Sequence, residues 1–161
     1  MIGIIGFGNW GCALAHHLGE LGANILAWDR DPLVLQSVNN HHRHPRYHEG
    51  ITLSSNIKVT EHLSDLKESS EILLIALPSH TLESMTWPDI QSTIPVVSAV
   101  KGFVGEKAQT PIQFLSDQLD NPLVAISGPS FAYDVIRGKP LGLVAASHDE
   151  KVAAQVAKIF S

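Results

Sequence analysis

Three glycines with the spacing Gly-x-Gly-x-x-Gly lie near the start of the chain, at Gly6, Gly8 and Gly11. They follow the apolar residues 2–5 and lead into an apolar-periodic stretch, so they join a predicted strand to a predicted helix, as a dinucleotide fingerprint requires. Gly6 permits a tight turn, Gly8 lets the backbone approach a pyrophosphate, and Gly11 lets the helix pack closely on the strand. The helix N-terminus offers unpaired N–H groups and a positive dipole end to phosphates. This run predicts a dinucleotide site.

Charged residues follow the second predicted strand. Asp29 lies about 20 residues beyond the glycine turn, where an acidic side chain usually accepts hydrogen bonds from ribose hydroxyls and so favours NAD. Arg30, directly after it, is suited to pair with a 2′-phosphate or to stack on adenine. The two residues favour different cofactors, so NAD and NADP both remain open from these residues alone.

Two further motifs follow later predicted strands. Ligands of open parallel sheets bind outside the carboxyl ends of the strands. Lys101, at such an end, is therefore expected near the reactive end of the cofactor, where its ammonium would hold a phosphate or polarise a carbonyl oxygen. Small residues in the run Ser127-Gly128-Pro129-Ser130-Phe131-Ala132 would let the backbone approach a substrate phosphate or the nicotinamide. Ordinary turn chemistry is the alternative explanation for both motifs.

Apolar runs of strand length alternate with helical patterns, which predicts an α/β fold with a doubly wound, mostly parallel sheet of Rossmann type. The expected strands cover residues 2–5, 23–28, 57–60, 72–77, 95–100, 123–127 and 141–146. The expected helices cover residues 10–21, 32–39 and 63–67. Two more helices are expected to begin with capping boxes, Thr110 with Gln113 and Ser147 with Glu150.

Composition narrows the classes of protein. A chain of 161 residues has room for one domain with a sizeable core. The net charge of −5 and the lack of a basic stripe argue against a nucleic-acid partner. No apolar run approaches the roughly 20 residues that span a bilayer, and no secretory signal is visible, so we expect no membrane partner and a cytoplasmic location. The single cysteine, Cys12, excludes an internal disulfide and is expected to be buried.

The least regular segment, residues 40–55, contains four histidines at positions 41, 42, 44 and 48. Such density invites a metal interpretation. The segment lacks cysteine, however, and Glu49 is its only acidic residue, and spacing alone fixes no ligand geometry. We expect no metal site and a solvated, partly ordered loop.

Taken in order, these motifs resemble those of the NAD(P)-dependent glycerol-3-phosphate dehydrogenases. The resemblance implies reversible hydride transfer between NAD(P)H and dihydroxyacetone phosphate, forming sn-glycerol 3-phosphate for phospholipid synthesis. The matching residues are Gly6-Phe7-Gly8-Asn9-Trp10-Gly11, Ala13-Leu14-Ala15, Trp28-x-Arg30-Asp31, Leu77-Pro78-Ser79, Lys101-Gly102, residues 127–132, Gly138-x-Pro140 and Phe160-Ser161.

The resemblance also implies residue roles. Lys101 falls on the lysine that touches both cofactor and substrate, and Gly128 and Ser130 fall on substrate-contacting positions. Ala132 falls near the nicotinamide. The residues expected at the cofactor, from the fingerprint and the resemblance together, are Gly6, Gly8, Asn9, Trp10, Gly11, Asp29, Arg30, Asp31, Lys101 and Ala132.

Three positions depart from the family pattern. Asn9 stands where serine is common. Asp31 stands where histidine is often found, and an acid there would repel a 2′-phosphate, which together with Asp29 tilts the expectation toward NAD. In the histidine-rich segment only Tyr47 and Gly50 remain of a Tyr-Leu-Pro-Gly-like run.

The family has a second, all-helical domain that supplies the general acid/base lysine and most of the substrate phosphate site. The resemblance therefore implies that residues 1–161 are a dinucleotide-binding domain without that domain and without its own last strands. A positioned acid contributes roughly 10²–10⁴-fold, so we expect nucleotide binding with little or no turnover. Apolar surface left uncovered would favour self-association as a homodimer. Two alternatives remain: a β-hydroxyacid or ketopantoate dehydrogenase domain, and a non-catalytic NAD-sensing module.

Overall fold

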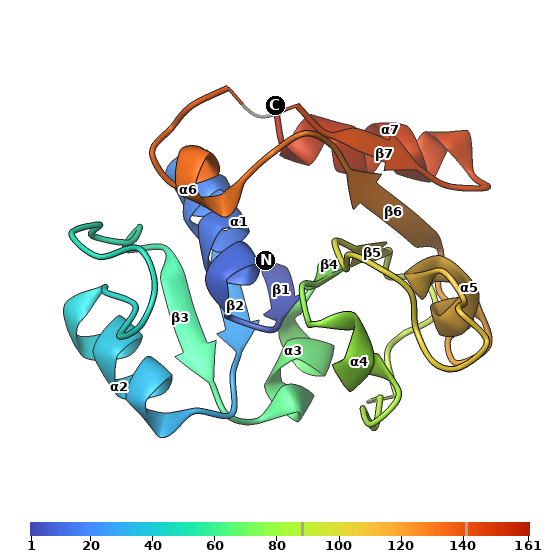
Figure 1. Cartoon of the computed structure of the whole chain (residues 1–161), viewed down its shortest axis with the longest axis horizontal. Coiled ribbons are helices and arrows are strands. Elements are labelled where there is room, and N and C mark those ends of the chain that lie inside the picture. Colours follow the sequence, from blue (N-terminus) through green and yellow to red (C-terminus); the bar gives the residue numbers. More distant parts are fainter. Residues whose placement is uncertain (88, 141) are drawn as a thin grey trace.

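A seven-stranded sheet forms the centre of the computed structural model, which describes residues 1–87, 89–140 and 142–161 (Figure 1). The strand order is β3-β2-β1-β4-β5-β6-β7. Neighbouring strands are parallel from β3 through β6, and β7 alone runs antiparallel to its neighbour, β6. This confirms the predicted doubly wound, mostly parallel α/β sheet. The strands are β1 Ile2–Ile5, β2 Ile25–Trp28, β3 Ile57–Thr60, β4 Ile72–Ile75, β5 Val96–Ser98, β6 Leu123–Ser127 and β7 Val144–Ala146.

Helices cover both faces of the sheet. Apolar residues of α1, α2, α6 and α7 join one core cluster, and those of α3, α4 and α5 join the other. In Figure 1, α1 and α6 lie together beyond one face, while α3 and α4 lie beyond the opposite one. The helices are α1 Asn9–Glu20, α2 Pro32–His41, α3 Leu63–Ser69, α4 Ser79–Leu82, α5 Pro111–Ser116, α6 Ala132–Val135 and α7 Glu150–Ile159.

The central strands are apolar on both faces because each face carries helices. Ile4 of β1 belongs to one core cluster and Ile5 to the other, as the alternation of side chains along a strand requires. The last residue of β1, Ile5, pairs with Trp28 on one side and Ile75 on the other. Strands β1, β2 and β4 therefore end together, and the loops that follow them meet at one edge.

The start of α7 differs from the prediction. Its N-cap is Asp149, whose carboxylate accepts hydrogen bonds from the N–H groups of Lys151 and Val152. Ser147 instead donates to the carbonyl of Leu123, so the capping box expected from Ser147 with Glu150 is wrong. The box expected at α5 is confirmed, since Thr110 and Gln113 exchange side-chain and backbone hydrogen bonds.

Several predicted elements keep their place with altered bounds, and the short α4 was not predicted. Leu141, predicted to open the last strand, lies outside the described residues. Cys12 is buried as expected, and burial raises the pKa of its thiol to about 12. Within the described part of the chain, no helix combines the length and apolar character needed to cross a membrane.

Candidate functional site

The glycine turn between β1 and α1 depends on its glycines for two different reasons. Gly6 has a φ of +99°, in the left-handed region that side chains avoid. A Cβ on Gly11 would lie 1.9 Å from the carbonyl oxygen of Gly6, so only glycine lets α1 lie this close to β1. A Cβ on Gly8 would meet nothing within 4 Å, which means that Gly8 faces open space.

This open space lies at the N-terminus of α1. The first N–H groups of any helix have no partner within the helix. At α2 and α7, the other helices of ten or more described residues, an aspartate caps these groups, Asp31 and Asp149 respectively. The N-cap of α1 is Gly8, which has no side chain to accept their hydrogen bonds. The turn therefore presents N–H donors and a positive dipole end to whatever lies beside Gly8.

Two adjoining cavities meet at this helix end, at the carboxyl edge of the sheet. The Asp29 cavity has a volume of about 570 Å³ and is lined by Gly6, Asp29, Arg30 and Arg46, among others. The Lys101 cavity has a volume of about 630 Å³. Both volumes are in the range of small-molecule sites. The residues that line both cavities are Gly8, Tyr47, Ala76, Leu77 and Pro78.

In the Asp29 cavity, two of the three charged residues predicted after β2 form part of the lining. Asp29 holds the chain in position by accepting the N–H of Asp31 at 2.9 Å. Arg30 is exposed and also lines the cavity. Asp31 does not line either cavity. Its carboxylate accepts the Leu33 N–H and pairs with Arg46, and these two contacts, in that order, hold its pKa below its ordinary value.

The Lys101 cavity is lined by the residues predicted near the reactive end of the cofactor. Asn9 and Trp10 reach it from the start of α1, and Lys101 reaches it from beyond β5. The Lys101 Nζ lies 5.4 Å from the centre of the Trp10 ring, a cation–π distance. Among the described residues that line this cavity, Lys101 is the only one with a positive charge.

Residues 128–132 form the far wall of the same cavity, including Gly128, Ser130 and Ala132. A Cβ on Gly128 would lie 1.9 Å from the Gly142 carbonyl oxygen, so glycine is required here by a backbone crossing. The Ser130 hydroxyl donates to that same carbonyl at 3.1 Å. Both residues thus have structural partners and also border the cavity.

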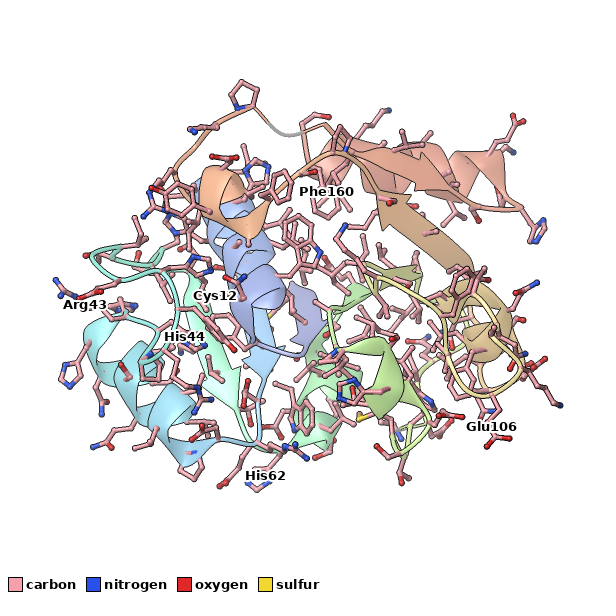
Figure 2. All side chains as sticks on the ribbon, in the orientation of Figure 1. Cys12, Arg43, His44, His62, Glu106 and Phe160 are labelled. Carbon is pink, nitrogen blue, oxygen red and sulfur yellow. The ribbon has the colours of Figure 1, made fainter. Side chains whose placement is uncertain are left out.

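The expectation of a solvated histidine-rich loop is wrong for its central part. His44 is 8% exposed, and its Nε2 lies 2.9 Å from the Phe7 carbonyl oxygen. Figure 2 labels this side chain between α2 and α1. The His48 Nε2 lies 2.8 Å from the carbonyl oxygen of Asn9. Two histidines therefore fasten this loop to the glycine turn, and the loop brings Tyr47 to both cavities.

Sequence reasoning missed Arg46, Tyr47 and His44 as site residues. The one available signal was that Tyr47 and Gly50 match the family's loop pattern. Within residues 1–87, 89–140 and 142–161, no three His, Cys, Asp or Glu side chains converge as metal ligands.

Comparisons with known proteins identify the family of the chain. A family model described as the N-terminus of NAD-dependent glycerol-3-phosphate dehydrogenase matches residues 1–153. The chain is 34% identical over 166 residues to a glycerol-3-phosphate dehydrogenase (NAD(P)+) of Nitratidesulfovibrio vulgaris, and this match covers 99% of the chain and 50% of that protein. It is 30% identical over 164 residues to the protein of the same name from Anaeromyxobacter sp., covering 98% of the chain and 49% of that protein.

Solved structures give the same fold. A glycerol-3-phosphate dehydrogenase from Coxiella burnetii superposes with a TM-score of 0.91 at 22% identity, over 99% of this chain and 50% of that one. The enzyme from Plasmodium falciparum superposes with a TM-score of 0.90 at 25% identity, over 99% and 49% respectively. The chain spans about half the length of the curated relatives it matches.

Proposed function

The chain belongs to the NAD-dependent glycerol-3-phosphate dehydrogenase family, and on this premise we propose that it is the dinucleotide-binding domain of such an enzyme. The whole protein would transfer hydride between NAD(P)H and dihydroxyacetone phosphate, forming sn-glycerol 3-phosphate. The family match favours this reading over a β-hydroxyacid or ketopantoate dehydrogenase. Membership of the family implies a nicotinamide cofactor, and we propose below which residues hold it.

One observation carries the proposal: the uncapped N-terminus of α1 lies at Gly8, where the two cavities join. A dinucleotide has its pyrophosphate in the middle and a nucleoside on each side. The pyrophosphate would lie on the helix N–H groups, the adenosine in the Asp29 cavity and the nicotinamide in the Lys101 cavity. Gly8 leaves the open space that such an approach needs.

The bound cofactor would supply or accept the hydride. Lys101 would use its ammonium to hold the substrate's phosphate or carbonyl oxygen next to the nicotinamide, with Trp10 supporting its position from below. Gly128 and Ser130 would border the substrate on the opposite wall, and Ala132 would border the nicotinamide. Lys101 would orient the substrate and would not replace a general acid, so we expect slow or no turnover by residues 1–161 alone.

The proposed cofactor is NAD, and Asp29 is the reason. Its carboxylate lines the cavity where a 2′-phosphate would lie and would repel it. Arg46 in that cavity is already paired with Asp31, and Arg30 would stack on the adenine. We expect NADH to bind about tenfold more tightly than NADPH, a difference equivalent to ~1.4 kcal/mol. Fluorescence titration of both nucleotides checks this, and Asp29→Asn should narrow the gap. Tighter binding of NADPH by the unaltered chain would overturn the preference.

Lys101→Met tests the proposed substrate end. Removing a charged hydrogen-bond donor typically costs about 1.5–3 kcal/mol, so the Kd of dihydroxyacetone phosphate for the NADH-bound chain should rise between about tenfold and a hundredfold. Calorimetry with dihydroxyacetone phosphate provides the measurement. Lys151→Met, at an exposed position of α7 outside both cavities, is the matched control and should change nothing. Equal affinities for the two variants would count against Lys101 as a substrate residue.

Large apolar side chains in the later part of the chain are exposed. Phe131, Tyr133 and Val144 are 74%, 61% and 69% exposed, and Phe131 borders the Lys101 cavity. These exposed apolar side chains support coverage by a further domain or by a second copy in a homodimer. The proposed setting is the cytoplasm, with the product used for phospholipid synthesis.

A further inference from the structure

The ring of His44 has a defined protonation state, which follows from its partners. Its Nδ1 lies 3.1 Å from the backbone nitrogens of both Arg46 and Tyr47. A backbone N–H only donates, so Nδ1 must be the unprotonated acceptor. Nε2 therefore carries the ring proton and donates it to the Phe7 carbonyl at 2.9 Å. His44 is thus a neutral imidazole with all of its hydrogen-bonding capacity in use.

These three hydrogen bonds connect parts of the site that are far apart in the sequence. Phe7 lies between the first two glycines of the turn, and its ring stacks on the His44 ring with centroids 5.9 Å apart. The Tyr47 ring also packs against the His44 ring, with centroids 4.9 Å apart, and Tyr47 lines both cavities. Arg46 lines the Asp29 cavity and pairs with Asp31 at the start of α2. The buried His44 ring therefore fixes the glycine turn, Arg46 and Tyr47 in position relative to one another.

We propose that His44 is a positioning residue for the dinucleotide: its neutral ring holds the glycine turn and the Arg46–Tyr47 wall together, and nucleotide binding weakens when the ring is protonated. The inference rests on the proposed nucleotide-binding function. His44 itself borders the Asp29 cavity, and the proposal adds that it also acts through the groups around it and makes binding dependent on pH.

The direction of the pH dependence follows from the surroundings of the ring. Burial lowers the pKa of His44, and the hydrogen bond to Phe7 opposes this effect. Arg46 and His48 from the same loop disfavour a charged ring, while Asp29 beyond β2 favours one. Asp31, at the start of α2, also senses the ring charge. The ring is therefore neutral at neutral pH, and at lower pH a proton on Nδ1 removes the acceptor of two backbone N–H groups.

Two variants separate the polar role from the packing role. His44→Phe keeps an aromatic ring and removes all three hydrogen bonds, so we expect the Kd for NADH to rise about tenfold at about pH 8. His44→Asn keeps a short side-chain oxygen that can accept from residues two and three positions on, as Asn does in turns. We expect it to weaken binding less than His44→Phe does at that pH, because it keeps the acceptor for Arg46 and Tyr47 and loses only the bond to Phe7.

The pH profile is the readout that a purely structural role would not produce. For the unaltered chain, the Kd for NADH should rise about tenfold as the pH falls below 6.5, the ordinary pKa of histidine, and the buried ring takes up its proton. His44→Asn should give a nearly flat profile. His62→Asn, a matched change at an exposed histidine, should keep the unaltered profile. Nitrogen NMR of the chain without nucleotide should find His44 in the Nε2–H form at neutral pH.

These measurements separate the role of His44 from the proposed nucleotide-binding function. Equal profiles for His44→Asn and the unaltered chain, or an Nδ1–H tautomer by NMR, would overturn the role of His44 while leaving nucleotide binding intact. Unchanged affinity in a folded His44→Phe variant would also overturn it. Absence of NADH binding by the unaltered chain at every pH would overturn the proposed function and this inference with it.

Discussion

Replacing Gly11 with alanine is expected to lower the free energy of unfolding by about 3 kcal/mol, at the upper end of the usual cost of overpacking. The added Cβ would lie 1.9 Å from the Gly6 carbonyl oxygen, well inside van der Waals contact. The position of the Cβ is fixed by the backbone and its neighbour is a backbone carbonyl, so no side-chain rotation relieves the contact. Helix α1 must then move off the sheet, where Leu14 and Leu18 are packed in the core.

Thermal and urea unfolding measure the effect. For a domain of this size, ~3 kcal/mol corresponds to a decrease in Tm of about 6–12 °C. Gly8→Ala is the matched control, because its Cβ would meet nothing within 4 Å and its φ of −74° suits any residue. If the two variants unfold at the same temperature, the close approach of α1 to β1 is not what Gly11 provides.

Replacing Gly8 with alanine is expected to weaken nucleotide binding strongly without lowering the stability of the fold. In the free chain the methyl group points into open space, so the Tm should remain unchanged. With a nucleotide bound, the same methyl group would occupy the region proposed for the pyrophosphate. Forcing a methylene into filled space costs about 1–3 kcal/mol, so the Kd for NADH should rise up to about a hundredfold.

The measurement is a fluorescence titration with NADH, accompanied by a thermal melt of the free variant. Unchanged affinity would mean that the nucleotide does not approach the backbone at Gly8. A lowered Tm would mean that the substitution acts on the fold, and the variant would then not report on the site. The two glycine variants together separate the structural and the binding functions of one turn.

The glycine turn could be predicted because its signal is local. Gly6, Gly8 and Gly11 lie within six residues between an apolar strand and an apolar-periodic helix, so this local pattern predicted the strand, the turn and the helix in order. The strand-end residue Lys101 could also be predicted, because parallel strands end at a common edge. These inferences needed only the direction of the chain in each element.

His44 could not be predicted because its partner lies 37 residues away, and the carbonyl of Phe7 has no signature in the sequence. Nearby His41 and His42 made all the loop histidines look alike. The start of α7 shows a similar limit. Ser147 and Asp149 both suit an N-cap, and the contact from Ser147 to Leu123, in a different strand, decides between them. In both cases a tertiary hydrogen bond selects among residues that local patterns cannot rank.

Asp31 has two structural roles, and both affect how the preference for NAD or NADP can be changed in evolution or by engineering. Its carboxylate caps α2 and neutralises Arg46, so a substitution by alanine would uncap a helix as well as remove a charge. Asn and Ser are good N-caps without a charge. Either one keeps the helix start and releases Arg46 toward the neighbouring cavity, which Arg46 already lines. On the proposed preference for NAD, a change toward NADP that also alters this position would therefore keep the start of α2 with Asn or Ser.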